Sequence, residues 1–448
     1  MHPNNLSAIT IKKPIDSLTF LTMTNKQGFL ALSPLLVFVA TYLTTSILAG
    51  DFYKTPISVA FLLSSMYAVS LTKGKNLRES IDIFSRGAST NNIMLMLWIF
   101  VLAGAFASAA KAIGSVDATV GLMLSVLPEN MVLPGLFLAT CFISLSIGTS
   151  VGTIVALVPI AVGLASSTQG NMALTTAVVV GGAFFGDNLS FISDTTIAAT
   201  SSQGCTMKDK FKVNFYITLP AALVILFIYT FMGLHYHSTA NSISASPIKV
   251  LPYIAVLGAA IAGMNVMRVL TIGIILTGII GIGCGIINVF DWLQAMGTGI
   301  TSMGDLIIVT MLAGGMFEIV RHNGGIDYII SKISIHIRGK RGAELVIGFL
   351  VGIIDLCTAN NTVAIISVGS IAKRIGKQYN LDNRRVASLL DTCSCCMQGI
   401  LPYGAQLLMA AGLSGLNPLK IIPYLYYPFA LAGCVVIAVL FRYPKKYS

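Results

Sequence analysis

Charged residues are scarce in this sequence. Charged residues make up only 10% of its 448 residues, whereas hydrophobic residues make up 55%. A soluble domain of this length carries about 25% charged residues. Apolar stretches of about 20 residues, the length that crosses a bilayer, recur along the whole chain. The composition therefore excludes a separate soluble domain and predicts an all-α polytopic membrane protein embedded in a lipid bilayer.

Residues that support catalysis are also scarce. The five histidines lie in predicted loops or tails, and no His-Glu-x-x-His segment occurs, which argues against an intramembrane enzyme. Most of the eight cysteines fall in apolar segments, as expected of small core residues rather than of a disulfide framework. The net charge of +11 is spread between hydrophobic spans and forms no patch. We expect no enzyme activity, no cofactor and no nucleic-acid partner.

The basic residues that are present follow the hydrophobic spans in a one-sided way. We interpret 134–165 and 345–371 as re-entrant hairpins, and 172–199 and 386–411 as broken helices, which gives about ten crossings. Of the 28 lysines and arginines, all but four then lie on the side of the two termini; the exceptions are Lys54, Lys111, Lys249 and Lys420. The positive-inside rule places that side in the cytoplasm. We predict a multi-pass protein of the cell inner membrane with both termini cytoplasmic.

The two halves of the chain resemble each other. Leu102-Ala-Gly-Ala-Phe matches Leu312-Ala-Gly-Gly-Met, and Ile147-Gly-Thr-Ser-Val matches Thr358-Ala-Asn-Asn-Thr. If each copy crosses the membrane an odd number of times, the second copy enters it from the opposite side and has inverted topology. Inverted repeats with discontinuous helices are typical of secondary transporters. The predicted organisation is a cytoplasmic tail (1–28), a first inverted repeat (29–234), an external linker (235–249) and a second inverted repeat (250–448).

Polar residues interrupt four of the apolar stretches. A helix break in lipid is costly unless the freed backbone groups line a polar cavity or a bound ion. The candidate hairpin tips are 148–150 and 359–362, and the candidate unwound segments are 186–190 and 398–402. Small residues there let the backbone approach an ion, and carbonyls, amides and hydroxyls are suitable ligands for Na⁺. Half-helix C-termini would add negative dipole ends.

Two aspartates mark the first unwound segment. Asp187 and Asp194 lie in an apolar context, and burial disfavours the charged form of a carboxylic acid, so such a group can exchange H⁺ for Na⁺. The alternative is that each caps the N-terminus of a half-helix. The matching position in the second half is the neutral Gln398. The predicted ion- and proton-binding residues are Asp187, Asp194, Asn188, Ser190, Thr195, Thr149, Ser150, Asp355, Asn360, Asn361, Thr362 and Gln398, with Na⁺ held at Asp187, Asn188, Asn360, Asn361 and Thr362.

Three short blocks of sequence are specific enough to compare with known protein families. They are Gly186-Asp-Asn-Leu-Ser-Phe-Ile-Ser-Asp, Asp355-Leu-Cys-Thr-Ala-Asn-Asn-Thr and Gln398-Gly-Ile-Leu-Pro-Tyr-Gly-Ala-Gln. In these blocks the chain resembles the NhaC-type Na⁺/H⁺ antiporter family of the ion-transporter superfamily. The resemblance implies hairpin tips paired with unwound helices, an elevator-like movement of a transport domain against a scaffold, and commonly a homodimer.

The leading hypothesis is a secondary active transporter that exchanges Na⁺ (or Li⁺) for H⁺. The alternative is a Na⁺-coupled symporter or exchanger of a small organic anion or amino acid, since some members of the family resemble malate/lactate exchangers. No lysine or arginine is expected in the core, so a carboxylate substrate would lack a cationic clamp. Bound Na⁺ and half-helix N-termini could substitute for it.

Overall fold

The computed structural model describes residues 25–49, 56–72, 75–126, 128–191, 193–234, 247–334, 337 and 339–447. Within these ranges all regular structure is helical, which confirms the predicted all-α fold. The predicted tail 1–28 is described only from residue 25, and the predicted linker 235–249 only from residue 247. The organisation into two inverted repeats stays a prediction.

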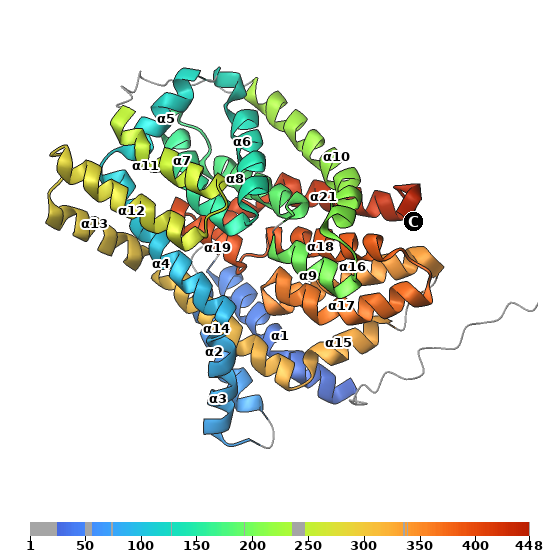
Figure 1. Ribbon diagram of the computed structural model, residues 1–448. Helices are drawn as coiled ribbons and strands as arrows, with labels where there is room; N and C mark the ends of the chain where they lie inside the picture. The colour runs from blue at the N-terminus through green and yellow to red at the C-terminus, as the bar shows by residue number, and fades with distance from the viewer. Residues whose placement is uncertain are drawn as a thin grey trace, which may run out of the picture.

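The helices are arranged as in Figure 1. In the first half they are α1 (Asn25–Leu48), α2 (Ile57–Leu71), α3 (Leu77–Ala88), α4 (Asn91–Ala112), α5 (Ser115–Val126), η1 (Glu129–Met131), α6 (Val132–Ile147), α7 (Ser150–Ser167), α8 (Met172–Leu189), α9 (Asp194–Gln203) and α10 (Met207–Gly233). In the second half they are α11 (Pro247–Ile261), α12 (Val266–Gly283), α13 (Val289–Ser302), α14 (Gly304–His322), α15 (Gly325–Ser334), α16 (Gly339–Thr358), α17 (Asn361–Gln378), α18 (Asn383–Ile400), α19 (Ala405–Ser414), α20 (Pro418–Ile421), η2 (Ile422–Tyr424), α21 (Tyr426–Leu440) and η3 (Lys445–Tyr447).

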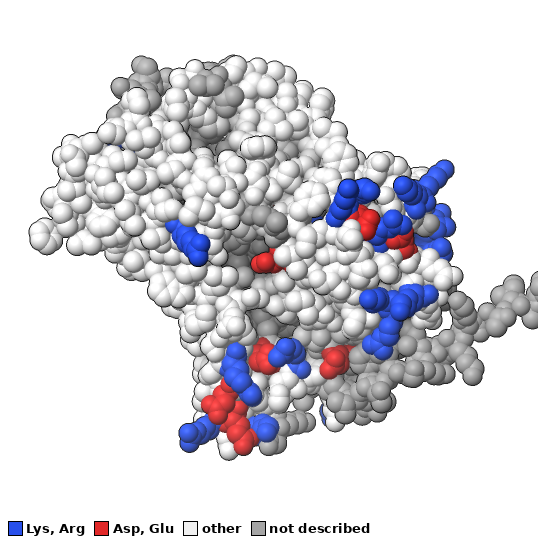
Figure 2. Space-filling model, viewed as in Figure 1, with Lys and Arg blue, Asp and Glu red and all other residues white. Residues whose placement is uncertain are grey.

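Length and composition make many of these helices membrane spans. Seven helical segments of the described chain are long and apolar enough to cross a bilayer, or eight if the pair Asn383–Ser414 and Pro418–Tyr424, bent by 95°, forms one span. Shorter apolar helices such as α2, α11 and α21 accompany them. The charged side chains on the face shown in Figure 2 gather around α3 and α15–α17 and are almost missing over α5, α6 and α11. The positive-inside rule expects such a one-sided distribution.

Helix breaks occur at both predicted hairpin tips. α6 ends at Ile147 and α7 begins at Ser150, and between them Gly148 has a φ of 74°, which glycine adopts at little cost. α16 ends at Thr358 and α17 begins at Asn361, with Ala359 at a φ of 50°. Each tip is therefore a turn of two residues that joins the two arms of a hairpin.

The other two breaks lie a few residues later than predicted. α8 continues through Asp187 and Asn188 to Leu189, and α18 continues through Gln398 to Ile400. The glycines that suggested unwinding allow close helix contacts instead. A Cβ at Gly186 would lie 2.1 Å from the Ser144 Oγ of α6, and one at Gly399 would lie 2.7 Å from Pro428 of α21. The residues outside regular helix at these breaks are, in the described chain, Ser190, Phe191 and Ser193 in the first half and 401–404 in the second.

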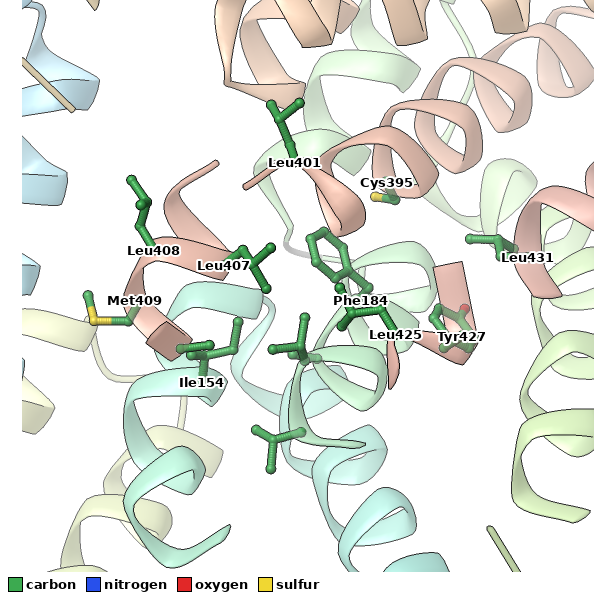
Figure 3. Packing of buried hydrophobic residues seen from close by; sticks show 14 of the residues in the cluster. Ile154, Phe184, Cys395, Leu401, Leu407, Leu408, Met409, Leu425, Tyr427 and Leu431 are labelled. Carbon is green, nitrogen blue, oxygen red and sulfur yellow. The ribbon is translucent and has the colours of Figure 1, made fainter. Parts of the chain in front are cut away.

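The broken helices of both halves share one apolar core. Figure 3 shows Ile154 of α7, Phe184 of α8 and Leu407 of α19 pointing toward a common centre, with Leu425 and Tyr427 at its edge. All of these side chains are buried. This packing holds the first hairpin and the first broken helix against the second broken helix, so the breaks lie near one another.

A buried ion pair ties α16 to α18. The Arg385 guanidinium donates to Glu344 at 3.2 and 3.3 Å and to the Tyr443 carbonyl oxygen at 2.9 Å, and both charged side chains are buried. In the sequence Arg385 is one of the basic residues between hydrophobic spans, and the structure shows that its side chain is nevertheless buried. The reason is that α18 is buried on all sides from Arg385 to Thr392, so every side chain of this stretch lies in the interior.

This pair gives a stability prediction. Arg385→Met should lower the free energy of unfolding by about 3–5 kcal/mol, because it leaves Glu344 as an uncompensated buried charge. The neighbouring Arg384 pairs with Asp382 at a partly exposed position, so Arg384→Met should cost no more than about 1 kcal/mol. Thermal unfolding of the two purified variants compares them directly. Equal losses would contradict the assignment of Arg385 to a buried bridge.

Candidate ion-binding site at the hairpin tips

A cavity of about 780 Å³ lies where the two hairpin tips meet the break between α8 and α9. One wall is apolar and comes from Leu95, Met96 and Ile99 of α4. The polar lining consists of Asn92, Thr149, Ser150, Asp187, Ser193, Asp194, Thr195, Ser201, Ser202, Asn360, Asn361, Thr362 and Gln406. Most of the predicted ion-binding residues therefore share one cavity, although they come from distant parts of the chain.

Asp187 lies at the bottom of a short polar network. Its Oδ1 accepts the backbone N–H of Ser150, the first residue of α7, at 3.1 Å, and the hydroxyl of Ser193 at 3.5 Å. The side chain is almost fully buried. Asp187 thus caps the N-terminus of another half-helix while it lines the cavity. The hydrogen bond fits the capping interpretation, and ion binding at Asp187 stays a prediction.

Helix N-termini, rather than C-termini, dominate the cavity wall. The first residues of α7, α9 and α17 are Ser150, Asp194 and Asn361, and all three line the cavity. The second residue of α19, Gln406, lines it as well. These ends carry partial positive charge. A cation can therefore bind here only through the negative charge of Asp187 and Asp194, the two acidic residues in the lining of the described chain.

The other polar residues of the lining are the acidic Asp194 and side chains with neutral oxygens. Asp194 is exposed to the cavity at the start of α9, and Thr195 shares a hydrogen bond of 2.8 Å with Ser193. Asn360 caps α17 by accepting the Val363 N–H at 3.0 Å, and the Asn361 Oδ1 accepts the Thr362 N–H at 3.1 Å. Both asparagines are thus held in fixed orientations at the second tip.

Two glutamines connect the hairpin tips. Gln406 donates to the Ser150 hydroxyl at 3.1 Å, and Gln398 donates to the Gln406 side-chain oxygen at 2.8 Å and to the Ala359 carbonyl oxygen at 3.3 Å. This chain of amides runs from the first tip to the second. Gln398 is behind the cavity rather than in its wall, and Gln406, which was not among the predicted ligands, is in the wall.

Besides Gln398, three further predicted site residues lie outside the cavity lining. Asn188 is fully buried, and its side chain donates to the Phe184 carbonyl oxygen at 2.9 Å. The carbonyl oxygen of the buried Ser190 accepts the Thr196 hydroxyl at 2.9 Å. Asp355 is fully buried in α16, and neither of its carboxylate oxygens has a hydrogen-bond partner among the residues that the structure describes.

The expectation of a core without lysine is wrong. Lys210, near the start of α10, is fully buried and pairs with Asp391 of α18 at 2.7 Å. It appeared to belong to a basic loop because Lys208 and Lys212 flank it. The spacing of Lys210, Asn214, Ile217 and Ala221, which lie on one helix face, is the signal that could have revealed its burial. Neither Lys210 nor any other lysine or arginine of the described chain lines the cavity.

Broken helices that meet at a polar cavity inside an apolar helical fold define a secondary transporter. The sequence matches the profile of the Na⁺/H⁺ antiporter family over residues 6–234 and 238–445. The chain therefore belongs to the Na⁺/H⁺ antiporter family, whose members are transporters and not enzymes.

Individual relatives have low sequence identity to the chain but align over most of its length. The chain is 22% identical to the malate-2H⁺/Na⁺-lactate antiporter of Bacillus subtilis, over 92% of this chain and 93% of that one. It is 22% identical to the Na⁺/H⁺ antiporter NhaC of the same organism, over 82% and 86% of the two chains. An uncharacterized Na⁺/H⁺ antiporter of Haemophilus influenzae is 23% identical over 66% of this chain and 71% of its own. The relatives thus include proteins named for sodium exchange alone and one named for organic acids.

Proposed function

We propose that this protein exchanges Na⁺ or Li⁺ for H⁺ across the cell inner membrane. In this proposal the cavity at the hairpin tips is the ion-binding site, and it opens to each side of the membrane in turn. The observation that carries the proposal is the position of the Asp187 carboxylate. It lies at a helix break, caps the tip of the first hairpin and faces the cavity that the second tip also lines. Membership of the Na⁺/H⁺ antiporter family supports cation/proton exchange as the reaction.

The exchange follows from competition at the carboxylates. When Na⁺ binds, Asp187 and Asp194 supply its negative charge, and Thr149, Ser150, Asn360, Asn361 and Thr362 supply neutral oxygens around the same space. When Na⁺ leaves, a proton takes its place, because a carboxylate in a desolvated site is costly to leave uncompensated. One site that holds either ion, but not both at once, couples the two fluxes in opposite directions.

The cavity wall supports an elevator-like movement. The tips and breaks on one side are polar and joined by Gln398 and Gln406, whereas α4 on the other side offers Leu95, Met96 and Ile99. An apolar wall makes few hydrogen bonds that a sliding partner would have to break. In this proposal the hairpins and broken helices carry the ion as one body past α4, and protons return by the same route.

A flux experiment tests the proposed exchange. The protein is reconstituted in Na⁺-free liposomes with a pH dye inside, and NaCl is added outside. We expect the interior to become alkaline as Na⁺ enters and H⁺ leaves, with no organic substrate present. Choline chloride should give no change. An interior pH that does not respond to Na⁺ in active, folded preparations would refute Na⁺/H⁺ exchange as the function.

A second candidate function is Na⁺- and H⁺-coupled exchange of a small organic anion. The relative named for malate and lactate aligns over almost the whole chain, and the cavity is far larger than the roughly 30 Å³ of one water molecule. The four helix N-termini could hold a carboxylate without a lysine or arginine. In the same liposomes, pH changes that require malate or lactate in addition to Na⁺ would favour this second function.

A further inference from the structure

The Lys210 ammonium is surrounded by the kinds of oxygen ligand that surround a bound metal cation. An ammonium has three N–H donors. At Lys210 they meet the Asp391 Oδ2 at 2.7 Å, the Asn188 carbonyl oxygen at 2.8 Å and the Thr196 hydroxyl at 2.6 Å. These ligands are a carboxylate, a backbone carbonyl and a hydroxyl, which are the oxygen types that Na⁺ binds. They come from α18, from the last turn of α8 and from α9.

The surroundings contain more acceptors than this one ammonium satisfies. Asn214 donates to the Asn188 carbonyl oxygen and to the Asp391 Oδ2, both at 2.8 Å. Within the described chain, however, the Asp391 Oδ1 and the side-chain oxygen of Asn214 have no hydrogen-bond partner, although they are buried. A pocket with surplus buried oxygens is built around positive charge. Its single negative charge is Asp391, and its single positive charge is Lys210.

The pocket is also placed where a second transported cation would bind. Asn188 directly follows Asp187. The Asn188 carbonyl oxygen, which accepts a hydrogen bond from Lys210, therefore belongs to the same end of α8 as the proposed exchange site. This carbonyl lies at the C-terminus of α8, where the helix dipole favours a cation. Thr196 belongs to α9 beyond the break. The ammonium therefore connects the end of α8 with α9 from outside the cavity lining.

We propose that Lys210 is a tethered cation that permanently occupies a second cation site behind the α8–α9 break. The transported ion then uses the cavity at Asp187 alone, and one cation is exchanged in each cycle. The Lys210 side chain also holds the end of α8 and the start of α9 together when no Na⁺ is bound in the cavity. This inference rests on the proposed function for its consequence in transport, but the second site itself can be tested without transport.

The test vacates the site and measures whether Na⁺ fills it. The background is Asp187→Asn, in which the cavity has lost its buried carboxylate, and the probe is ²²Na⁺ in equilibrium binding. Asp187→Asn should bind little Na⁺. Asp187→Asn with Lys210→Ala should regain one Na⁺ per chain, because Asp391, the Asn188 carbonyl and Thr196 remain. Adding Asp391→Asn should abolish this binding. Lys212→Ala, an exposed lysine on the same helix, is the matched control and should gain none.

Thermal stability gives a second measurement. The melting temperature of Lys210→Ala should rise with NaCl by about 1.5 °C for each tenfold increase, and not with choline chloride. If Lys210 has only a structural role, the melting temperature of Lys210→Ala does not respond specifically to Na⁺, and no ²²Na⁺ is bound; that result overturns the proposal. A Lys210→Ala chain that does not fold even in high NaCl also overturns it.

The two proposals fail separately. A wild-type protein that exchanges Na⁺ for H⁺, together with a Lys210→Ala variant that binds no additional Na⁺, removes the tethered cation and leaves the proposed function intact. A wild-type protein that moves no Na⁺ removes the proposed function, and the ²²Na⁺ binding of the variants still decides whether Lys210 occupies a cation site.

Discussion

Replacement of Asp187 by asparagine is expected to abolish Na⁺-driven proton movement while the protein stays folded. Asparagine keeps an oxygen that can accept the Ser150 N–H, so the cap on α7 survives. The negative charge is lost, however, and four helix N-termini face the same cavity. Two unit charges 4 Å apart interact by about 4 kcal/mol at an effective dielectric constant of 20. The loss therefore corresponds to roughly a thousandfold weaker Na⁺ binding.

The measurement is the pH-dye experiment in liposomes, with circular dichroism and size-exclusion chromatography to show that the variant is folded. Asp194→Asn is the matched comparison, because it makes the same chemical change at an exposed carboxylate of the same cavity. We expect a smaller loss there, since solvent screens an exposed charge. A fully active Asp187→Asn protein, or a dead Asp194→Asn beside an active Asp187→Asn, would show that the central carboxylate has been misassigned.

The sequence alone was sufficient for the helical fold and for the approximate places of the breaks. Polar residues such as Thr149 and Asn360 inside apolar stretches are costly in lipid unless the helix breaks there around a polar cavity. The tips could therefore be located to within a residue or two. The unwound segments were less accurate, because a glycine such as Gly186 has two meanings. It can weaken a helix, or it can let a second helix approach, and only the position of Ser144 decides between them.

The two missed features depend on contacts between distant residues. Lys210 lies among other lysines in the sequence, and its partner Asp391 is on α18, so only the folded chain shows that the two charges neutralise each other. In the sequence Gln398 was interpreted as the neutral counterpart of Asp187, and Gln406 was not singled out. The structure gives them a role of their own, since they connect the Ser150 hydroxyl to the Ala359 carbonyl oxygen.

Gly186 provides the second large prediction, because it is where the first hairpin touches the first broken helix. A Cβ at this position would lie 2.1 and 2.2 Å from the Oγ and Cβ of Ser144 and 2.5 Å from its carbonyl carbon. The last of these is a backbone atom that cannot rotate away. Gly186→Ala must therefore push α6 from α8. Overpacking of this kind typically costs about 1–3 kcal/mol, occasionally more.

The effect on transport should exceed the effect on stability. α6 leads directly into the tip that donates the Ser150 N–H to Asp187, so a displaced α6 moves the tip away from the carboxylate. We expect a lower melting temperature and little Na⁺-driven pH change, both measured against Gly258→Ala, where a Cβ meets nothing within 4 Å. Ser144→Gly, added to Gly186→Ala, removes the two closest atoms and should restore part of both properties. Wild-type exchange in Gly186→Ala alone would mean that the contact between α6 and α8 does not set the position of the hairpin tip.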